Sequence, residues 1–479
     1  MQTPLSTFSR PMTRRQLLVR CSNGFGAVAL TSLMTDPAYG SLVTTGANPQ
    51  GGGLHHPAKA KNVIFLYQNG GPSQLDTFDP KPRVQKEHGQ PISMTIPPLQ
   101  FVPLGSSPKV LASPFRFTRF GQCGQQVSEI FPLLGTCVDD MCFIKSMTAQ
   151  FAEHANANLF LHTCFNQQGR PSLGSWVNYG LGSESKDLPG YVVLKGSYIP
   201  AGGPDNFGNG FLPAIYQGSV FRDTVAPVPN LEPPAGNAQL QQGRRDLLKV
   251  LDQSVLGRLG NDDRVEAAIS NYELAFRMQG AIPDLLDIRN ETAATKKLYG
   301  IDEAATNDYG RQCLMARRLV ERGVRFVEVG PQQCQGANRW DQHDRIKEGH
   351  TANGQCSDRP ISGLIKDLKS RGLLETTLIV CAGEFGRTPC QQSATQGRDH
   401  NPYGYTIWMA GGGVKGGTSY GATDEYGFRA VENRVEMFDL HATILHLLGI
   451  DHKRLTYRFG GRDMRLTDVH GEVVQGVLA

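Results

Sequence analysis

Short, almost wholly apolar runs alternate along this chain with stretches that have helical periodicity. The runs are rich in β-branched and aromatic residues and lie at 63–67, 141–144, 191–194, 324–329, 377–381 and 405–410. Such runs are typical of strands buried on both faces. One apolar helical face, with the spacing i, i+3, i+4 and i+7, is formed by Ile361, Leu364, Ile365 and Leu368. Strands separated by helices predict a three-layer α/β/α sandwich around a mainly parallel sheet.

Two segments depart from this alternation. Residues 221–300 contain a proline-rich stretch followed by a charged, mostly helical one, which we interpret as a helical insertion or lid. Residues 41–60 are rich in Gly, Pro, Thr and His and predict a linker. The sheet domain is therefore expected to span residues 61–479, with the insertion at about 221–300.

Residues 1–40 have the features of an export signal. A basic start precedes an apolar stretch at 24–34, and small residues stand at Ala38 and Gly40. A bilayer core needs about 20 apolar residues, so no stable transmembrane span is predicted. Residues 13–18, which include the Arg14–Arg15 pair, resemble the twin-arginine signal, implying export to the periplasm or cell surface. An uncleaved signal holding the protein at the membrane surface is the alternative.

Charge and cysteine content exclude several classes of protein. The chain has 48 Lys+Arg and 44 Asp+Glu, for a net charge of +4, which does not favour nucleic-acid binding. Hydrophobic residues make up 39%, enough for a core, so the chain is not disordered. The ten cysteines include no CxxC pair, which argues against a cysteine-based zinc site and leaves the disulfide connectivity open.

Side chains that can bind metals gather beside the predicted strands. In open α/β sheets, ligands bind beyond the carboxyl ends of the strands. Carboxylates and imidazoles follow three of the runs and precede the last one; they are Asp76, Asp341, His343, Glu384, Asp399 and His400. This mixture suits one or two divalent ions, such as zinc, manganese or calcium. The sequence therefore predicts a metal site at this edge.

Four further residues are candidates for catalysis. Two metal ions can activate a nucleophile and stabilise the leaving oxygen of a phosphoryl or sulfuryl group. The segment after residues 141–144 offers the hydroxyls of Ser146 and Thr148, and then His154; the residues alone do not choose between the two hydroxyls. The planar guanidinium of Arg387 could hold a tetrahedral anion or pair with Glu384.

Six segments together resemble an uncharacterised family called "domain of unknown function 1501". They are Gly70–Pro82, Trp340–His343, Gly383–Pro389, Arg398–Asn401, Gly411–Gly417 and Asp439–Leu445. The resemblance runs from about Lys61 to the C-terminus. It implies a twin-arginine exported, sulfatase-like protein related to the alkaline phosphatase superfamily, with one or two metals at the strand ends.

The resemblance also implies roles for single residues. Asp341 and His343 resemble the pair that holds one metal, and His400 resembles the late metal histidine. Glu384 stands where the superfamily usually has an aspartate after a late strand.

Two features depart from the superfamily pattern. The first strand ends in Gln68–Asn69 where an aspartate is usual, and Asp76, several residues later, is a possible substitute. The motif whose Cys or Ser becomes formylglycine in sulfatases is absent, so a formylglycine sulfatase is not expected.

Two functions follow as hypotheses. The first is an exported, metal-dependent hydrolase of phosphate or sulfate esters, acting on a small or polysaccharide substrate. The second is a non-catalytic sulfatase-like scaffold that binds a sulfated glycan or a protein partner. Bound metal and ester turnover distinguish the two.

Overall fold

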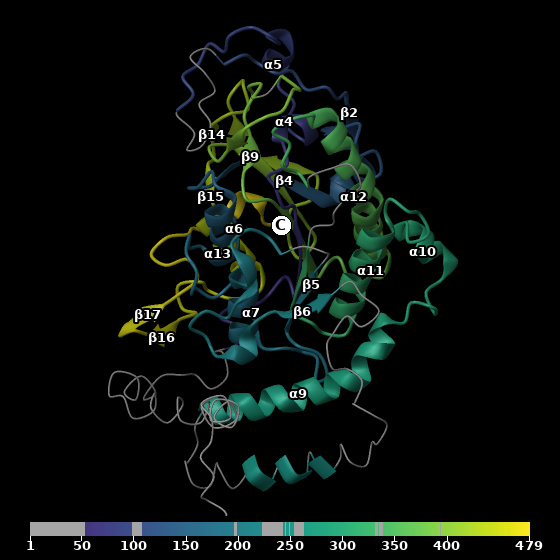
Figure 1. Ribbon diagram of the computed structural model, residues 1–479, viewed down its shortest axis with the longest axis vertical. Helices are drawn as coiled ribbons and strands as arrows, with labels where there is room; N and C mark the ends of the chain where they lie inside the picture. The colour runs from purple at the N-terminus through teal and green to yellow at the C-terminus, as the bar shows by residue number, and fades with distance from the viewer. Residues whose placement is uncertain are drawn as a thin grey trace, which may run out of the picture. The chain divides into compact units, whose positions relative to one another are not determined.

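The computed structural model describes residues 53–97, 108–195, 199–222, 263–330, 334, 339–392 and 394–479, together with 243, 244, 246–248 and 250–252 (Figure 1). The predicted signal at 1–40 and most of the predicted linker lie outside the described residues. The chain divides into two compact units. Gln50–Leu455 and Arg465–Ala479 form the unit that carries the candidate site. The hairpin of β16 (Tyr457–Phe459) and β17 (Arg462–Met464) belongs to the other.

A nine-stranded sheet organises the larger unit, in the order β12-β4-β11-β8-β1-β7-β5-β6, with β15 also paired to β4. Its strands are β1 (Asn62–Tyr67), β4 (Met141–Thr148), β5 (Tyr191–Lys195), β6 (Ser219–Arg222), β7 (Phe326–Val329), β8 (Thr377–Ala382), β11 (Tyr405–Ala410), β12 (Thr418–Tyr420) and β15 (Val435–Glu436). All six predicted runs are strands of this sheet, so the expected mainly parallel α/β architecture is confirmed.

One strand of this sheet, β11, runs against its neighbours. It pairs antiparallel with β4 and with β8, while β1 pairs parallel with β7 and β8. The start of an antiparallel strand lies at the same edge as the carboxyl ends of the parallel strands. The segment that enters β11 therefore reaches the edge where a doubly wound sheet binds its ligands.

Helices cover both faces of the sheet because successive strand side chains point to opposite sides. Ile64 and Leu66 of β1 belong to a core cluster with residues of α11 (Asn307–Glu321) and α12 (Ile346–Ser370). Phe65 points the other way, with its ring centroid 6.1 Å from that of His162 in α6. The helices of that face are α6 (His154–Thr163), α7 (Leu173–Leu181) and α13 (Met437–Leu447).

Two buried contacts fix α6 on the sheet. His162 Nε2 lies 3.0 Å from Glu328 Oε1 on β7, and the Tyr67 hydroxyl of β1 donates a hydrogen bond of 2.5 Å to Asn158 Oδ1. Burial opposes the charged form of His162, but Glu328 prevails and raises its pKa. These contacts leave the first residue of the helix, His154, at the carboxyl edge of the sheet.

The predicted helical insertion contains α9 (Asp263–Leu286) and α10 (Ala293–Tyr299). Ile282 and Leu285 of α9 are fully buried and belong to the same core cluster as α11 and α12. Residues 223–242 lie outside the described residues, and the role of the insertion as a lid stays a prediction.

Shorter elements complete the larger unit. They are α4 (Gln74–Thr77), α5 (Pro82–Lys86), β2 (Phe117–Phe120), β3 (Gln125–Ser128), η2 (Leu134–Asp140), η3 (Gly203–Phe207), η4 (Ala214–Tyr216), β9 (Gly386–Arg387), β10 (His400–Asn401), β13 (Ala422–Thr423), β14 (Ala430–Glu432) and η5 (Gln475–Val477). Among the described helices, none combines the length and the apolar character needed to cross a membrane.

Candidate metal centre

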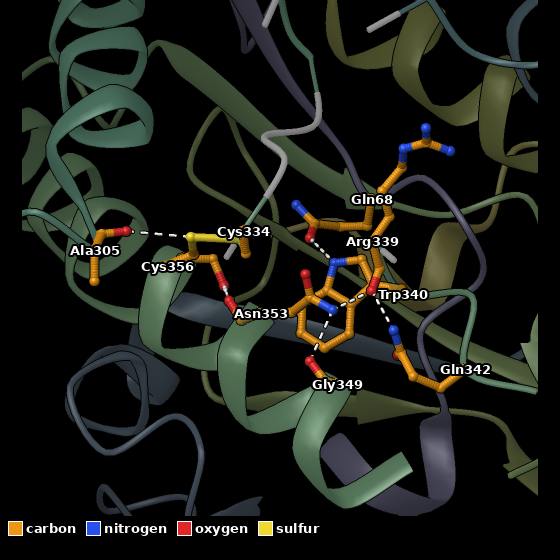
Figure 2. Close-up of a disulfide and its surroundings, with 10 residues drawn as sticks. Gln68, Ala305, Cys334, Arg339, Trp340, Gln342, Gly349, Asn353 and Cys356 are labelled. Carbon is orange, nitrogen blue, oxygen red and sulfur yellow. Dashed lines mark hydrogen bonds between the residues drawn. A yellow bond between two sulfur atoms is a disulfide. The ribbon is translucent and has the colours of Figure 1, made fainter. Parts of the chain in front are cut away.

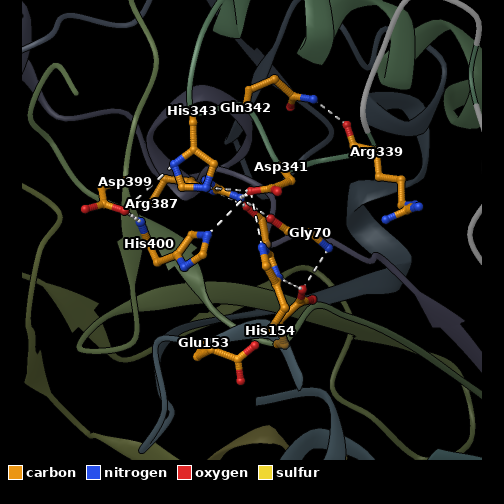
Figure 3. Close-up of polar contacts among 12 residues, drawn as sticks. Gly70, Glu153, His154, Arg339, Asp341, Gln342, His343, Arg387, Asp399 and His400 are labelled. Atoms are coloured by element: carbon orange, nitrogen blue, oxygen red, sulfur yellow. Dashed lines mark hydrogen bonds and ion pairs between the residues drawn. The ribbon is translucent and has the colours of Figure 1, made fainter. Parts of the chain in front are cut away.

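Four side chains from three separate segments converge at the carboxyl edge of the sheet (Figure 3). His154 opens α6, Asp341 and His343 lie between β7 and α12, and His400 lies in β10 just before β11. One potential ligand atom from each residue lies within 4.8 Å of the others. The antiparallel direction of β11 is what brings His400 to the edge where the parallel strands end.

The three imidazoles face one carboxylate oxygen. Asp341 Oδ1 lies 3.3 Å from His154 Nε2, 3.0 Å from His343 Nε2 and 3.4 Å from His400 Nε2. His154 Nε2 is buried and has no hydrogen bond of good geometry among the described residues. Three ring nitrogens and one carboxylate oxygen therefore surround a common point, as the ligands of a metal ion do.

The outer nitrogen of each ring contacts an acceptor. His154 Nδ1 lies 2.8 Å from Glu384 Oε1, His343 Nδ1 lies 2.5 Å from Gln392 Oε1, and His400 Nδ1 lies 2.5 Å from the Ala152 carbonyl oxygen. An acceptor on Nδ1 selects the tautomer with its proton there and leaves a lone pair on Nε2. Lone pairs of three imidazoles would then face an ionised carboxylate.

A cation at the centre would stabilise this arrangement, because the Nε2 lone pairs and the Asp341 carboxylate repel one another at these distances. Burial opposes ionisation of Asp341, but its close contacts with the three histidines and the charge of Arg387 prevail, so the pKa of this carboxyl lies well below its usual range. Burial also disfavours a charged His154, yet Asp341 and Glu384 prevail and raise its pKa to about 9. Burial lowers the pKa of His400 to about 3. An ionised Asp341 facing three imidazoles favours a cation at this point.

Arg387 contacts one of the four converging side chains, Asp341, from the protein interior. Its side chain is fully buried; Nη2 lies 2.6 Å from Asp341 Oδ1 and also donates to the Gly70 carbonyl oxygen. Nε donates to the Gly71 carbonyl oxygen at 2.9 Å, and Nη1 donates to the Arg398 carbonyl oxygen at 3.1 Å. The guanidinium of Arg387 therefore contacts Asp341 and the turn after β1, and its nitrogens are hydrogen-bonded within the protein.

The turn after β1 touches the loop that carries Asp341. Gly70 has φ +105°, and a Cβ at this position would lie 2.7 Å from the backbone nitrogen of Asp341. Only glycine fits this turn, because both the backbone angle and the close approach exclude a side chain. Its own N–H donates to Glu384 Oε1 at 2.9 Å.

Glu384 and Asp399, both predicted as ligands, lie behind the four converging side chains. Glu384 is fully buried and contacts His154 Nδ1 and the Gly70 amide; its other oxygen, Oε2, has no hydrogen-bond partner among the described residues. Asp399 Oδ1 accepts the backbone N–H of His400 at 2.9 Å and lies 3.8 Å from His343 Nδ1. Burial raises the pKa of Asp399. Both carboxylates therefore contact histidines of the group of four.

The structure does not bring Asp76 to this cluster. Its carboxylate is fully buried and pairs with Arg398, with 2.7 Å between Oδ2 and Nε, and it accepts the Ser73 hydroxyl at 2.5 Å. Burial disfavours its ionised form, but Arg398 prevails and keeps the pKa of Asp76 below its usual value. This carboxylate balances a buried arginine.

The two candidate hydroxyls face a different part of the chain. Ser146 donates to the Asn433 carbonyl oxygen at 2.6 Å, and Thr148 donates to the Val435 carbonyl oxygen at 3.3 Å while accepting from Arg434 Nε at 3.1 Å. Among the hydrogen bonds of the described residues, neither hydroxyl contacts the four converging side chains.

Two residues that contact the histidines, Gln392 and Ala152, could not be predicted from the sequence. Gln392 lies in a polar loop, and Ala152 acts through its carbonyl oxygen, so nothing in the sequence marks either as a histidine partner. The sequence predicts His154 as a catalytic candidate; the structure sets it among the four converging side chains. Its position after the strand at 141–148 was the available signal.

Comparison with known proteins identifies the family of the chain. The family model described as "Protein of unknown function (DUF1501)" matches residues 60–478. No curated protein sequence matches the chain.

Several solved structures resemble the chain at low sequence identity. A sulfatase from Pseudoalteromonas sp. is 11% identical, with a TM-score of 0.33 over 81% of this chain and 68% of that one. The alkaline phosphatase of the Antarctic bacterium TAB5 is 9% identical, with a TM-score of 0.34 over 82% and 98%. A phosphonate monoester hydrolase from Silicibacter pomeroyi is 13% identical, with a TM-score of 0.33 over 67% and 68%.

Proposed function

The chain belongs to the DUF1501 family, and we propose that it is an exported, metal-dependent hydrolase of phosphate or sulfate esters. The observation that carries the proposal is the convergence of three Nε2 atoms on Asp341 Oδ1, with an acceptor at every Nδ1. The ester class comes from the resemblance of the six sequence segments to sulfatase-like proteins.

Four residues would hold one ion: His154, Asp341, His343 and His400. Three nitrogens and one oxygen suit Zn²⁺ or another first-row transition ion such as Mn²⁺, whereas Ca²⁺ takes six to eight oxygen ligands. The group of four is complete for one ion, and the described residues contain no second group of three or more such ligands. When bound, the ion would polarise an ester oxygen as a Lewis acid and offset charge that develops on it.

The protein's own residues prepare this site. Glu384, Gln392 and the Ala152 carbonyl oxygen hold the three imidazoles in the tautomer that turns Nε2 inward. Arg387 holds Asp341 in place through its Nη2 atom. Because these supports are buried or half-buried, the ligand set is organised before an ion arrives.

Two measurements test this function. Elemental analysis of the purified protein should find close to one transition ion per chain, and a panel of phosphate and sulfate esters should reveal turnover that disappears in His343→Ala and His400→Ala. A folded protein without metal above background would overturn the proposal. Export is tested by mass spectrometry: a mature N-terminus near Ser41 supports cleavage of the leader, and an intact Met1 supports retention at the membrane surface.

One observation favours the second candidate, a non-catalytic scaffold that binds a sulfated glycan or a protein partner. The hydroxyls of Ser146 and Thr148 are bound to backbone of the 433–435 segment, and Arg387 is fully buried. Neither hydroxyl is presented to an ester at the centre. A protein that holds its ion, binds a sulfated oligosaccharide and turns over no ester in the panel would support this function.

A further inference from the structure

A disulfide joins Cys334, which precedes Asp341 and His343 in the sequence, to helix α12 (Figure 2). It joins Cys334, which follows β7, to Cys356 within α12; the two Cα atoms are 6.1 Å apart, inside the usual range for a disulfide. Two of the four proposed ligands, Asp341 and His343, lie in sequence between these cysteines. The bridge therefore closes a covalent loop that contains half of the ligand set.

Helix α12 is also the surface against which this loop packs. Asn353 Nδ2 donates to the Arg339 carbonyl oxygen, and also to the Gly349 carbonyl oxygen at 2.9 Å. Gln342 Nε2 donates to the same Arg339 carbonyl at 2.5 Å. A Cβ on Gly349 would lie 2.4 Å from Gln342 Cγ, so helix and loop approach as closely as glycine permits. The loop thus takes its position from α12, to which the disulfide ties it.

The loop also contains unfavourable backbone conformations. Arg339 has φ +46° and Arg345 has φ +42°, both in the left-handed region that disfavours residues other than glycine. Trp340 between them is anchored by a hydrogen bond of 2.8 Å from Nε1 to Gln68 Oε1 and by its ring, whose centroid lies 5.0 Å from that of His350. Such conformations persist when the surrounding structure holds them in place.

We propose that the Cys334–Cys356 disulfide is a positioning element of the metal centre, which pre-organises Asp341 and His343 and thereby raises metal affinity. This inference rests on the proposed function. A closed loop has fewer conformations before the ion arrives, so less ordering opposes binding. His154 and His400 lie outside the closed loop.

The test compares the full-length chain with its Cys334→Ser/Cys356→Ser variant. Zn²⁺ affinity is measured by competition with a chromogenic chelator, and Co²⁺ is used as a second probe because its visible absorption bands report the ligand geometry. We expect the double variant to bind Zn²⁺ roughly 10- to 100-fold more weakly, the range typical when a support of metal ligands is lost. Cys123→Ser, which removes an exposed free thiol, is the matched control and should bind as the unaltered protein does.

The outcomes separate this inference from the proposed function. Weaker binding with unchanged Co²⁺ bands supports the bridge as a positioning element. A folded double variant with unaltered Zn²⁺ affinity overturns it, while leaving the metal centre intact. If the double variant does not fold, the unaltered protein is reduced after folding with a phosphine, and unchanged Co²⁺ affinity in the reduced form then overturns the inference. An unaltered protein that binds neither ion overturns the metal centre itself.

Discussion

His154 and Glu384 are joined by a contact of 2.8 Å between Nδ1 and Oε1, although 230 residues separate them in the chain. Glu384 is fully buried beside β8, and His154 is the first residue of α6. The contact directs His154 Nε2 toward Asp341 Oδ1, 3.3 Å away. A carboxylate behind a metal-binding histidine fixes the orientation of the ring and raises its basicity. Glu384 thereby acts on the centre through another residue.

Removing this carboxylate should weaken metal binding. We expect Glu384→Ala to lower Zn²⁺ affinity by roughly 10- to 100-fold, because His154 loses its partner. Glu384→Gln keeps an acceptor oxygen and should lose less. Chelator competition measures both, with Glu129→Ala, at a solvent-exposed carboxylate, as control. An equal loss in the alanine and glutamine variants would contradict the role of the acceptor.

Removing a ligand should abolish stoichiometric binding. His343→Ala and His400→Ala each leave three of the four converging side chains, and an incomplete ligand set holds a transition ion poorly. Elemental analysis after gel filtration should fall from close to one ion per chain to a small fraction. His470→Ala, at an exposed histidine, should retain the full amount. Retention by both ligand variants would place the ion elsewhere.

Arg387→Lys distinguishes support of the centre from substrate binding. The structure gives Arg387 contacts to Asp341 and to three backbone carbonyls, so a lysine with one nitrogen cannot replace it. We expect Zn²⁺ affinity to fall about tenfold or more. If Arg387 instead holds the substrate anion, KM rises while metal affinity stays unchanged, and kinetics at saturating metal separate the two results.

Asp76→Asn should lower the free energy of unfolding without preventing metal binding at the centre. The substitution leaves Arg398 buried without its charged partner, which costs about 3–5 kcal/mol in the free energy of unfolding. Denaturant titration at pH 7 measures this loss. Elemental analysis of the folded variant should still find the metal ion. Loss of the ion in this variant would indicate that Asp76 is a metal ligand.

The same ion pair predicts a dependence of stability on pH. The pKa of Asp76 is lower in the folded protein than in the unfolded chain, where it is about 3.9. Its contribution is therefore present above that value and is lost as the pH falls through the folded pKa. The difference in unfolding free energy between the unaltered protein and Asp76→Asn should shrink in acid. A difference that stays constant between pH 7 and pH 3 would contradict this origin.

Much of the fold could be predicted from local pattern. The continuous apolar runs that became β1 and β8 have the composition of strands buried on both faces, and the spacing of Ile361, Leu364 and Leu368 is that of a helix. Such patterns are local, so the sequence carries them directly. The alternation also places polar residues at strand ends, which is why the sequence predicts Asp341 and His343 as neighbours, and the structure brings them together.

The partner of each of those polar residues could not be predicted from the sequence. Asp76 and Asp341 are both aspartates beyond strand ends, yet one neutralises Arg398 and the other faces three imidazoles. Glu384 was predicted to bind metal or pair with Arg387; it contacts His154, and Arg387 contacts Asp341. Two of these assignments depend on partners far away in the chain, because 322 residues separate Asp76 from Arg398 and 230 separate His154 from Glu384.

The sequence by itself therefore determined the α/β architecture, the family, and the edge of the sheet where residues able to bind a metal gather, because apolar periodicity and short motifs are properties of neighbouring residues. Only the tertiary structure decided which side chains meet: that His154 joins Asp341, that β11 runs antiparallel and delivers His400, and that Cys334 pairs with Cys356. The physical reason is that ligand geometry, burial and ion pairing are set by distances across the fold, and chain order does not encode those distances locally.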